Sequence, residues 1–423
     1  MTTPAKPQSV QRTIEAVWRI ESPRLIGGLV RMLRDIGDAE DAAQNALVSA
    51  LENWAKAGVP DNPGAWLMAT AKNRAIDRLR REKLAQQKFD GLGDESEFTP
   101  VSLQSPSEAA DDDIGDDLLR LIFVACHPIL PAEARVALTL RLLGGLSTDE
   151  IARAFLLPEA TIAQRIVRAK RTLAQQPVAF EVPRRAELSE RLDSVLGVIY
   201  LIFNEGYAAT SGSDWMRPGL CEEALRLGRV LAGLVPNESE VHALVALMEI
   251  HASRAGARVN GDGEPILLLE QNRSRWDRLL IRRGLIALKR AEQLGGSERP
   301  YALQAAIAAC HARALRADDT DWALIATHYG TLAKVMPSPV VELNRAVACG
   351  MAYGAAAGLQ LADQLVDEPA LSRYHLLPAV RGDLLFKLGR RAQAREQFQL
   401  AASLTDNERE RNLMRQRAAA CSP

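Results

Sequence analysis

The side chains best suited to chemistry in this chain lie in residues 147–171, and the chemistry that they suit is binding to a nucleic acid. Ser147 and Glu150 have the spacing of a capping box, and Pro158 follows a break at a first-turn position of a second helix. The apolar face of that helix consists of Ile162, Ile166 and Ala169. The residues that point away from this face include polar and cationic ones: Thr161, Gln164, Arg165, Arg168, Lys170 and Arg171.

A short helix with polar and cationic residues on one face can enter the major groove of DNA. There it reads base edges and neutralises phosphates. Residues 147–171 therefore predict a helix-turn-helix, with the second helix as the reader. A solvated basic helix of an ordinary helical protein is the competing interpretation.

A second cationic helix is predicted after Asn62, Pro63 and Gly64. Its inner stripe is Leu67, Ala71, Ala75 and Leu79, and its outer face is basic. The polar residues on and beside that face are Lys72, Asn73, Arg74, Asp77, Arg78, Arg80 and Arg81. Trp66 precedes them and could stack on a base, although a tryptophan at this position is more often part of a core.

An acidic helix is predicted N-terminal to both of these segments. Asp38 can cap it, and Glu40 and Asp41 suit the positive end of its dipole. Its inward positions are Ala43, Leu47, Ala50 and Trp54, and its outer face shows Asp41, Gln44 and Asn45. Residues 12–33 also have helical periodicity, with a break or a first turn at Pro23 and a weak middle at Gly27 and Gly28.

The composition is that of an ordinary globular protein with few aromatic residues and many helix formers. With 423 residues, two to four domains are expected, and the net charge of −1 gives no hint of nucleic acid. The distribution of charge does, because residues 90–117 contain ten acidic residues and no lysine or arginine. Such a segment is expected to be a largely disordered linker.

No constellation for catalysis or for a metal stands out. The five cysteines are scattered, the six histidines lack ligand spacing, and no phosphate-binding glycine loop is present. We therefore expect no enzyme, cofactor or metal, reduced thiols, no membrane segment and a cytoplasmic location. A hydrolase joined to a DNA-binding part is conceivable but has no support in the residues.

Residues 38–54 and 63–81 together resemble the second conserved region of bacterial sigma factors, and residues 118–173 resemble the fourth. The order of these blocks, the acidic linker and the lack of a third-region insert are similar to the extracytoplasmic-function class. The resemblance implies an all-α protein with a region 2 domain at 10–88, an acidic linker at 89–115 and a region 4 helix-turn-helix domain at 116–176.

The resemblance also implies roles for the residues. The acidic helix would dock on the polymerase core, on the β′ clamp and the β subunit, through Asp38, Asp41, Gln44, Asn45, Leu47 and Trp54. The basic helix would hold the −10 promoter element through Trp66, Lys72, Asn73, Arg74, Asp77, Arg78, Arg80 and Arg81. The −35 element would be read by Thr161, Gln164, Arg165, Arg168, Lys170 and Arg171. The acidic linker would thread through a cationic channel of the polymerase.

A helical domain is predicted at 188–423. The residues Gly382, Leu385, Gly389, Ala394, Phe398 and Ala401 match the small-residue pattern of a tetratricopeptide repeat, and weaker copies precede them. Polar-aromatic clusters at 203–207, 272–277 and 320–322 and at Asn344 and Arg345 are predicted first as helix ends and packing corners. They could also line a groove for a regulatory protein or ligand.

The preferred hypothesis is a sigma factor with a regulatory C-terminal extension, which directs polymerase core to promoters. The runner-up is a one-component regulator in which 188–423 senses a ligand or protein and 118–173 binds an operator. A third alternative is an interaction scaffold built on the repeats. The acidic and basic helices of 38–81 discriminate, because a repressor needs neither.

Overall fold

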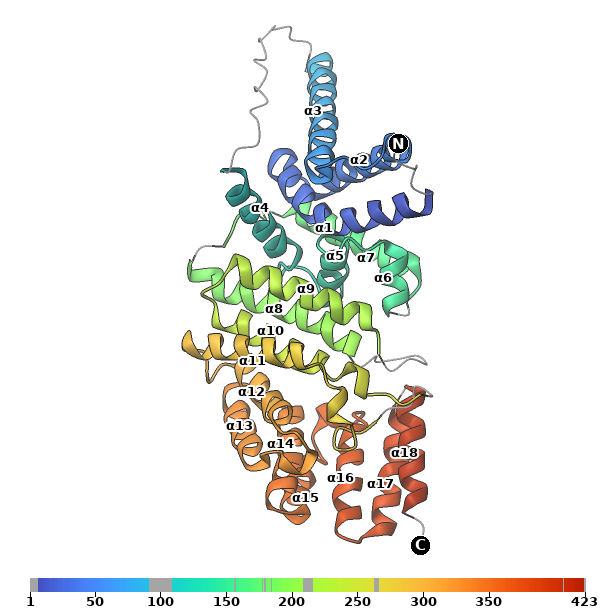
Figure 1. Cartoon of the computed structure of the whole chain (residues 1–423), viewed down its shortest axis with the longest axis vertical. Helices are drawn as coiled ribbons and strands as arrows, with labels where there is room; N and C mark the ends of the chain where they lie inside the picture. Colours follow the sequence, from blue (N-terminus) through green and yellow to red (C-terminus); the bar gives the residue numbers. More distant parts are fainter. Residues whose placement is uncertain are drawn as a thin grey trace. The chain divides into compact units, whose positions relative to one another are not determined.

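The computed structural model describes residues 7–90, 109–155, 157–176, 178, 180–183, 185–207, 216–261, 266–405 and 407–421. These residues form α-helices, short 3-10 turns and loops without a β-strand, which confirms the all-α prediction. The chain divides into two compact units, residues 1–198 and 199–423 (Figure 1). Each unit is described by itself.

The first unit contains two groups of helices. The first group is α1 (Pro7–Leu33), α2 (Ile36–Ala57) and α3 (Pro63–Asp90). The second is α4 (Ala109–Ala125), α5 (Ala132–Leu142), α6 (Thr148–Phe155) and α7 (Glu159–Gln175), and α8 (Arg185–Tyr207) begins in this unit. Helix α1 packs on α2, α3 and α4, so it joins the two groups.

Small side chains let α2 approach its neighbours closely. Ala39, Ala43, Ala46 and Ala50 are fully buried along one face of this helix. Asp35, which directly precedes the helix, caps it by accepting a hydrogen bond from the backbone N–H of Asp38 at 2.9 Å. The prediction that Asp38 is the cap was therefore wrong, because the helix begins at Ile36, three residues earlier than a cap at Asp38 requires.

Helix α1 is continuous through Pro23, so the break predicted there was wrong. The glycines that weakened the prediction have a packing role instead. A Cβ on Gly27 would lie 3.0 Å from the carbonyl oxygen of Asp117 at the end of the acidic stretch. Glycine at this position lets the backbones of α1 and α4 come close together, and this packing offsets its poor helix propensity.

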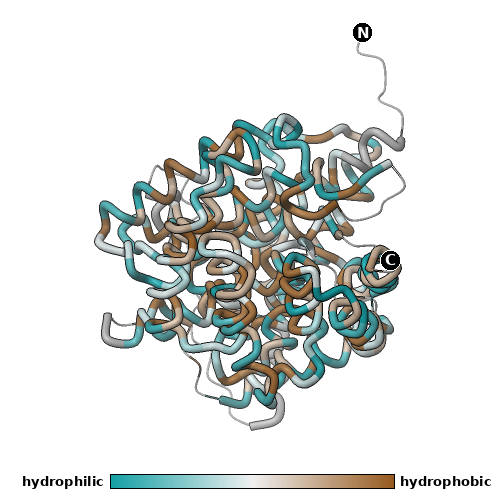
Figure 2. Tube along the Cα trace, turned by 90° about the horizontal axis from the view of Figure 1, so that it is seen from below, coloured by the Kyte–Doolittle hydropathy of each residue, from teal (hydrophilic) through white to brown (hydrophobic). Residues whose placement is uncertain are grey.

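The second unit is a succession of helices in which neighbours along the chain pack on each other. They are α9 (Pro218–Leu234), α10 (Ser239–Ala252), α11 (Arg278–Gln293), α12 (Pro300–Arg313), α13 (Trp322–Val335), α14 (Pro339–Tyr353), α15 (Ala355–Asp363), α16 (Leu376–Lys387), α17 (Arg391–Leu404) and α18 (Glu408–Ala420). Hydrophobic and hydrophilic residues alternate along the helices (Figure 2), as expected where each helix buries one face.

The small-residue pattern has a direct counterpart in this packing. A Cβ on Gly382 would lie 2.8 Å from the ring of Phe398, so glycine lets α16 rest on that ring. Gly389 ends the helix with a φ of +74°, a conformation that side chains other than glycine adopt rarely. Ala394 and Ala401 are fully buried beside Phe398 on α17. The last helix pair thus has the tetratricopeptide-like build that the sequence predicts.

Candidate polymerase and promoter interface

The helix-turn-helix forms as its sequence indicates. The N–H of Glu150 donates to Oγ of Ser147 at 3.1 Å, and the N–H of Ser147 donates to Oε2 of Glu150 at 2.8 Å, so both halves of the capping box are made. Pro158 is the N-cap of α7, one position before the first-turn place predicted for it. The turn residue Leu156 lies outside the described residues.

Helix α7 is anchored by its apolar stripe and exposes a polar face. Ile162, Ile166 and Ala169 are buried, as predicted. Gln164, Arg168 and Arg171 are exposed, and Thr161 and Arg165 are half-buried beside them. Among the described residues, none of the three arginines of α7 forms an ion pair. The structure therefore brings five of the six predicted −35 residues to one surface.

The sixth residue, Lys170, points elsewhere. Its ammonium forms an ion pair with Glu40 of α2, a residue whose side chain is only 4% exposed. The guanidinium of Arg141, on α5, contacts the same carboxylate at 2.6 Å. Burial raises the pKa of Glu40, but the charges and hydrogen bonds of Lys170 and Arg141 outweigh it, and the net effect lowers that pKa.

The predicted polymerase-docking residues lie along α2. Asp41 and Asn45 are exposed, and Asp38, Gln44 and Leu47 are half-buried. Gln44 donates a hydrogen bond to Oε1 of Glu40 at 2.7 Å. Trp54 is buried, with its ring centroid 5.3 Å from that of Trp66 in an edge-on arrangement. An acidic and amide face of α2 is thus presented over an apolar base.

The predicted −10 residues lie along α3. Lys72, Asn73, Arg74, Asp77 and Arg80 are exposed, and Trp66 is half-buried against Trp54. The guanidinium of Arg74 donates to Oγ of Ser49 on α2 at 2.7 Å. The side chains of Arg78 and Arg81 and the linker 91–108 lie outside the described residues.

The contacts between the two groups of helices are features that the sequence analysis missed. The guanidinium of Arg19, on α1, contacts Glu150 of α6 at 2.9 Å. A Cβ on Gly145, in the loop before α6, would lie 3.1 Å from Oγ of Ser22. Glu40 had been assigned only to the helix dipole. The feature of the sequence that could have indicated a buried contact is the position of Glu40 beside the alanine-rich face of α2.

In the second unit, three polar-aromatic clusters that are distant in sequence meet. Arg254 donates to the hydroxyl of Tyr207 at 2.6 Å and lies 5.8 Å from the ring of Trp276. Arg273 donates to the carbonyl oxygens of His311 and Ala314 at 2.8 and 2.9 Å and so caps the end of α12. A further bond of 2.9 Å joins it to the hydroxyl of Thr320.

These clusters form a packing corner, as predicted. Arg273 bonds to carbonyl and hydroxyl groups, and the carboxylate of Asp277 caps α11 through the N–H groups of Leu279 and Leu280. The segment 203–207 ends α8, as predicted. Arg345 contacts Glu342 on its own helix and takes no part in the corner.

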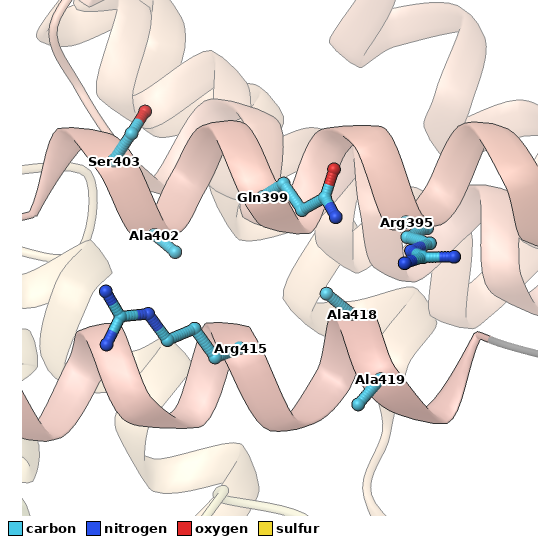
Figure 3. A pocket seen from close by; sticks show the side chains of 7 residues that line it. All are labelled: Arg395, Gln399, Ala402, Ser403, Arg415, Ala418 and Ala419. Atoms are coloured by element: carbon cyan, nitrogen blue, oxygen red, sulfur yellow. The ribbon is translucent and has the colours of Figure 1, made fainter.

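A groove of about 430 Å³ lies between α17 and α18 of this unit. Figure 3 shows Arg415 reaching from α18 toward α17, with Ala402 and Ala418 between the helices. In the part of the chain that the structure describes, no group of three or more histidine, cysteine or acidic residues could hold a metal ion. No helix among the described residues is long and apolar enough to cross a membrane.

Family profiles match three segments of the chain. Sigma-70 region 2 matches residues 18–84, which covers most of α1 to α3. Sigma-70 region 4 matches residues 120–173, which covers most of α4 to α7. A family of unknown function, DUF6596, matches residues 191–292, from within α8 to the end of α11.

Known proteins extend these matches. The chain is 42% identical over 389 residues to an uncharacterized protein of Rhizobium meliloti (strain 1021), covering 91% of this chain and 90% of the relative. It is 32% identical over 155 residues to the ECF RNA polymerase sigma factor SigK of Mycobacterium ulcerans (strain Agy99), covering 36% of this chain and 78% of the relative. For SigK of Mycolicibacterium vanbaalenii (strain DSM 7251 and its equivalents), the identity is 30% over 146 residues, covering 34% and 70%.

The crystal structure of yeast Tom70 aligns with 98% of this chain and 85% of its own, at 10% identity and a TM-score of 0.37, which is too low to carry an argument. The matches to the sigma regions do identify the family, because both regions occur in the predicted order and the SigK relatives are covered over at least 70% of their length. The chain belongs to the extracytoplasmic-function family of RNA polymerase sigma factors, which direct polymerase to promoters.

Proposed function

We propose that the two helix groups of the first unit divide promoter initiation between them. The acidic face of α2 docks on the polymerase core, on the β′ clamp and the β subunit, α3 holds the −10 strand, and α7 reads the −35 duplex. The observation that carries this assignment is the exposed face of α7, where Arg165, Arg168 and Arg171 have no carboxylate partner among the described residues. Cations held in this way are available to phosphates and base edges.

Run-off transcription tests the function as a whole. Purified core polymerase should transcribe a cognate promoter with this chain and should not do so without it. The Asp41→Arg and Gln44→Arg double variant should weaken core binding, because it reverses the charge of the proposed docking face. A double variant that folds and binds core as the parent does would remove α2 from the assignment.

The alternative of a one-component regulator is not favoured, because the chain matches sigma region 2 as well as region 4, and a repressor has no need of region 2. We propose further that the chain acts by binding rather than by catalysis, and in the cytoplasm, where core polymerase and promoter DNA are found. The second unit is proposed as a regulatory extension that takes a protein or ligand. The support for an extension that belongs to the protein is the Rhizobium meliloti relative, whose alignment covers 91% of this chain.

A further inference from the structure

The contact between Glu40, Arg141 and Lys170 joins the two halves of the sigma part of the chain. Glu40 lies on the helix proposed to bind polymerase, whereas Lys170 lies on the helix proposed to read DNA. Arg141 reaches the carboxylate from α5, 101 residues away in sequence, at 2.6 Å. Gln44 donates a further hydrogen bond to the carboxylate of Glu40 at 2.7 Å.

We propose that these residues form a latch that holds regions 2 and 4 together in the free chain, and that the latch must open before the chain can bind core polymerase and occupy a promoter. The proposal rests on the proposed function. We call Glu40, Arg141 and Lys170 the latch.

The reason is the length of a promoter. The elements at −10 and −35 are separated by about 25 base pairs, which is roughly 85 Å of duplex at 3.4 Å per base pair. In the latched chain α2 and α7 are in side-chain contact through Glu40 and Lys170. One chain cannot hold both elements across that span while this contact persists, so promoter binding requires the latch to separate.

Because the carboxylate of Glu40 is buried, removing one partner of the latch has a different energetic cost from opening the whole contact. The side chain of Glu40 is 4% exposed, whereas those of Arg141 and Lys170 are each 22% exposed. Removing the cations would therefore leave a buried charge, which is costly, but opening the whole contact lets all three groups regain water. A second, weaker contact between Arg19 and Glu150 has a side chain 59% exposed and contributes little.

A closed population lowers the apparent affinity for any partner that needs the open form. The apparent dissociation constant is the intrinsic value divided by the fraction of open molecules. Breaking the latch should therefore tighten core binding, whichever residue is changed. Glu40→Gln removes a negative charge and Arg141→Gln removes a positive one, so an effect of the same sign in both variants reports the contact rather than net charge.

The first measurement uses the free chain and is independent of polymerase. Acetylation of lysine amines by an N-hydroxysuccinimide ester, followed by mass spectrometry, should label Lys170 more slowly than the exposed Lys72 and Lys289. Labelling of Lys170 should become several-fold faster in Glu40→Gln. Glu52→Gln, an exposed site on the same helix, should leave its rate unchanged. Equal labelling of Lys170 and Lys72 in the parent chain would overturn the latch.

The second measurement is the affinity for core polymerase. Glu40→Gln and Arg141→Gln should each tighten binding about tenfold, the order expected for loss of a hydrogen bond to a charged group in the closed state. The double variant should gain no more than either single variant, because both remove one contact. Arg153→Gln is the matched control, since the ion pair that Arg153 forms among the described residues is with Asp149 on its own helix.

The outcomes separate the latch from the proposed function. Weaker core binding by both variants, or opposite effects that follow charge, would overturn the latch and place Glu40 in the docking surface. If Glu40→Gln fails to fold, Arg141→Gln still tests the contact, because its side chain is partly exposed. If neither parent nor variants bind core while Lys170 is released in the variants, the latch stands and the proposed function is overturned.

Discussion

At the scale of single residues, the six cations and polar groups predicted on α7 divide into two kinds. Arg168 and Arg171 are exposed on the outer face, whereas Lys170 is held by a buried carboxylate. Spacing alone cannot separate them, because all are polar residues of one short helix. Which of them is free is decided by what packs against the helix, and that partner is more than 100 residues away.

Arg168 is the residue on which we base the −35 prediction. Arg168→Ala should weaken binding to a −35 duplex by about 1–3 kcal/mol if the lost contact is to a base, and should relax sequence preference at that position. If the contact is to a phosphate, binding should weaken equally for all sequences and the salt dependence should decrease. Titration of holoenzyme against matched and scrambled promoters at two salt concentrations distinguishes these results. Unchanged promoter affinity would exclude this residue from the reading face.

Buried histidines are the other informative residues, because they make the second unit sensitive to acid. Burial, and then the charges of Arg254 and Arg273, lower the pKa of His311 to about 3. His251 is lowered well below its usual pKa by burial and by Arg254 and Arg258. In the unfolded chain both rings take up a proton near pH 6.5. Between their lowered pKa in the folded state and pH 6.5, the rings are neutral in the native state and protonated in the unfolded chain. The free energy of unfolding is therefore highest above pH 6.5 and declines as the pH falls below it.

The size of this effect can be stated for His311. At about pH 5 it should cost the second unit about 2 kcal/mol relative to pH 7, since each pH unit below the unfolded pKa is worth about 1.4 kcal/mol. His311→Gln keeps an uncharged side chain and should lessen the pH dependence by about one proton. Hydrogen exchange of α12 between pH 7 and pH 5, corrected for intrinsic rates, measures the change. An identical pH dependence in the parent and the variant would contradict the assignment.

At the scale of elements, the packing of α14 and α15 depends on glycine. A Cβ on Gly358 would lie 2.6 Å from the carbonyl oxygen of Ala346 and 2.7 Å from the Cα of Gly350. These are backbone atoms, which cannot move aside without displacing a helix. Gly330, in the interior of α13, has open space around the same position.

The two glycines should therefore respond in opposite directions to one substitution. Gly358→Ala should destabilise the second unit by about 1–3 kcal/mol through overpacking. Gly330→Ala should leave packing intact and raise stability by up to about 1 kcal/mol through helix propensity. Thermal unfolding of the two variants, followed by circular dichroism, measures the sign. A gain in stability in Gly358→Ala would show that the helices are not in close backbone contact.

The elements also show how far the sequence could predict the fold. The capping box of Ser147 and Glu150 and the apolar stripe of α7 were predictable, because residues three or four apart in a helix meet whatever surrounds them. The continuity of α1 through Pro23 was not, because α1 packs on α2, α3 and α4, and a local preference does not include that packing. The corner around Arg273 was predicted in kind but not in its partners, which are carbonyls of another helix.

The same reasoning applies to the candidate site. Its residue types and their order along α2, α3 and α7 follow from periodicity and from resemblance to a family. The latch does not, because a glutamate near a helix start is already explained by the helix dipole. Only the meeting of three helices gives it two cationic partners.

At the scale of the whole molecule, the extension begins inside a helix that also supports region 4. Arg191 of α8 donates to the carbonyl oxygen of Phe123 at 2.8 Å, and Ser194 donates to that of Cys126 at 2.6 Å. Arg135 of α5 donates to the hydroxyl of the same serine. The first turns of α8 therefore satisfy carbonyl groups at the end of α4, which would otherwise lack partners.

Two truncations can separate this support from any role of the second unit. A chain of residues 1–180 loses the α8 contacts and should have a less stable region 4 than a chain of residues 1–198, which keeps them. Each lost hydrogen bond is worth about 1 kcal/mol. Hydrogen exchange of α4 in the two fragments measures the difference. Equal protection would mean that α8 does not support region 4.

The 1–198 fragment then tests the extension. With region 4 intact, its transcription from a cognate promoter should differ from that of the full chain at equal concentration and with the same core enzyme. A mask over the DNA-binding face would raise output when removed, and a brace against polymerase would lower it. We expect a decrease, because region 4 is a small helical unit that a brace against polymerase would hold in place. Equal output from the two chains would assign residues 199–423 to a task separate from initiation.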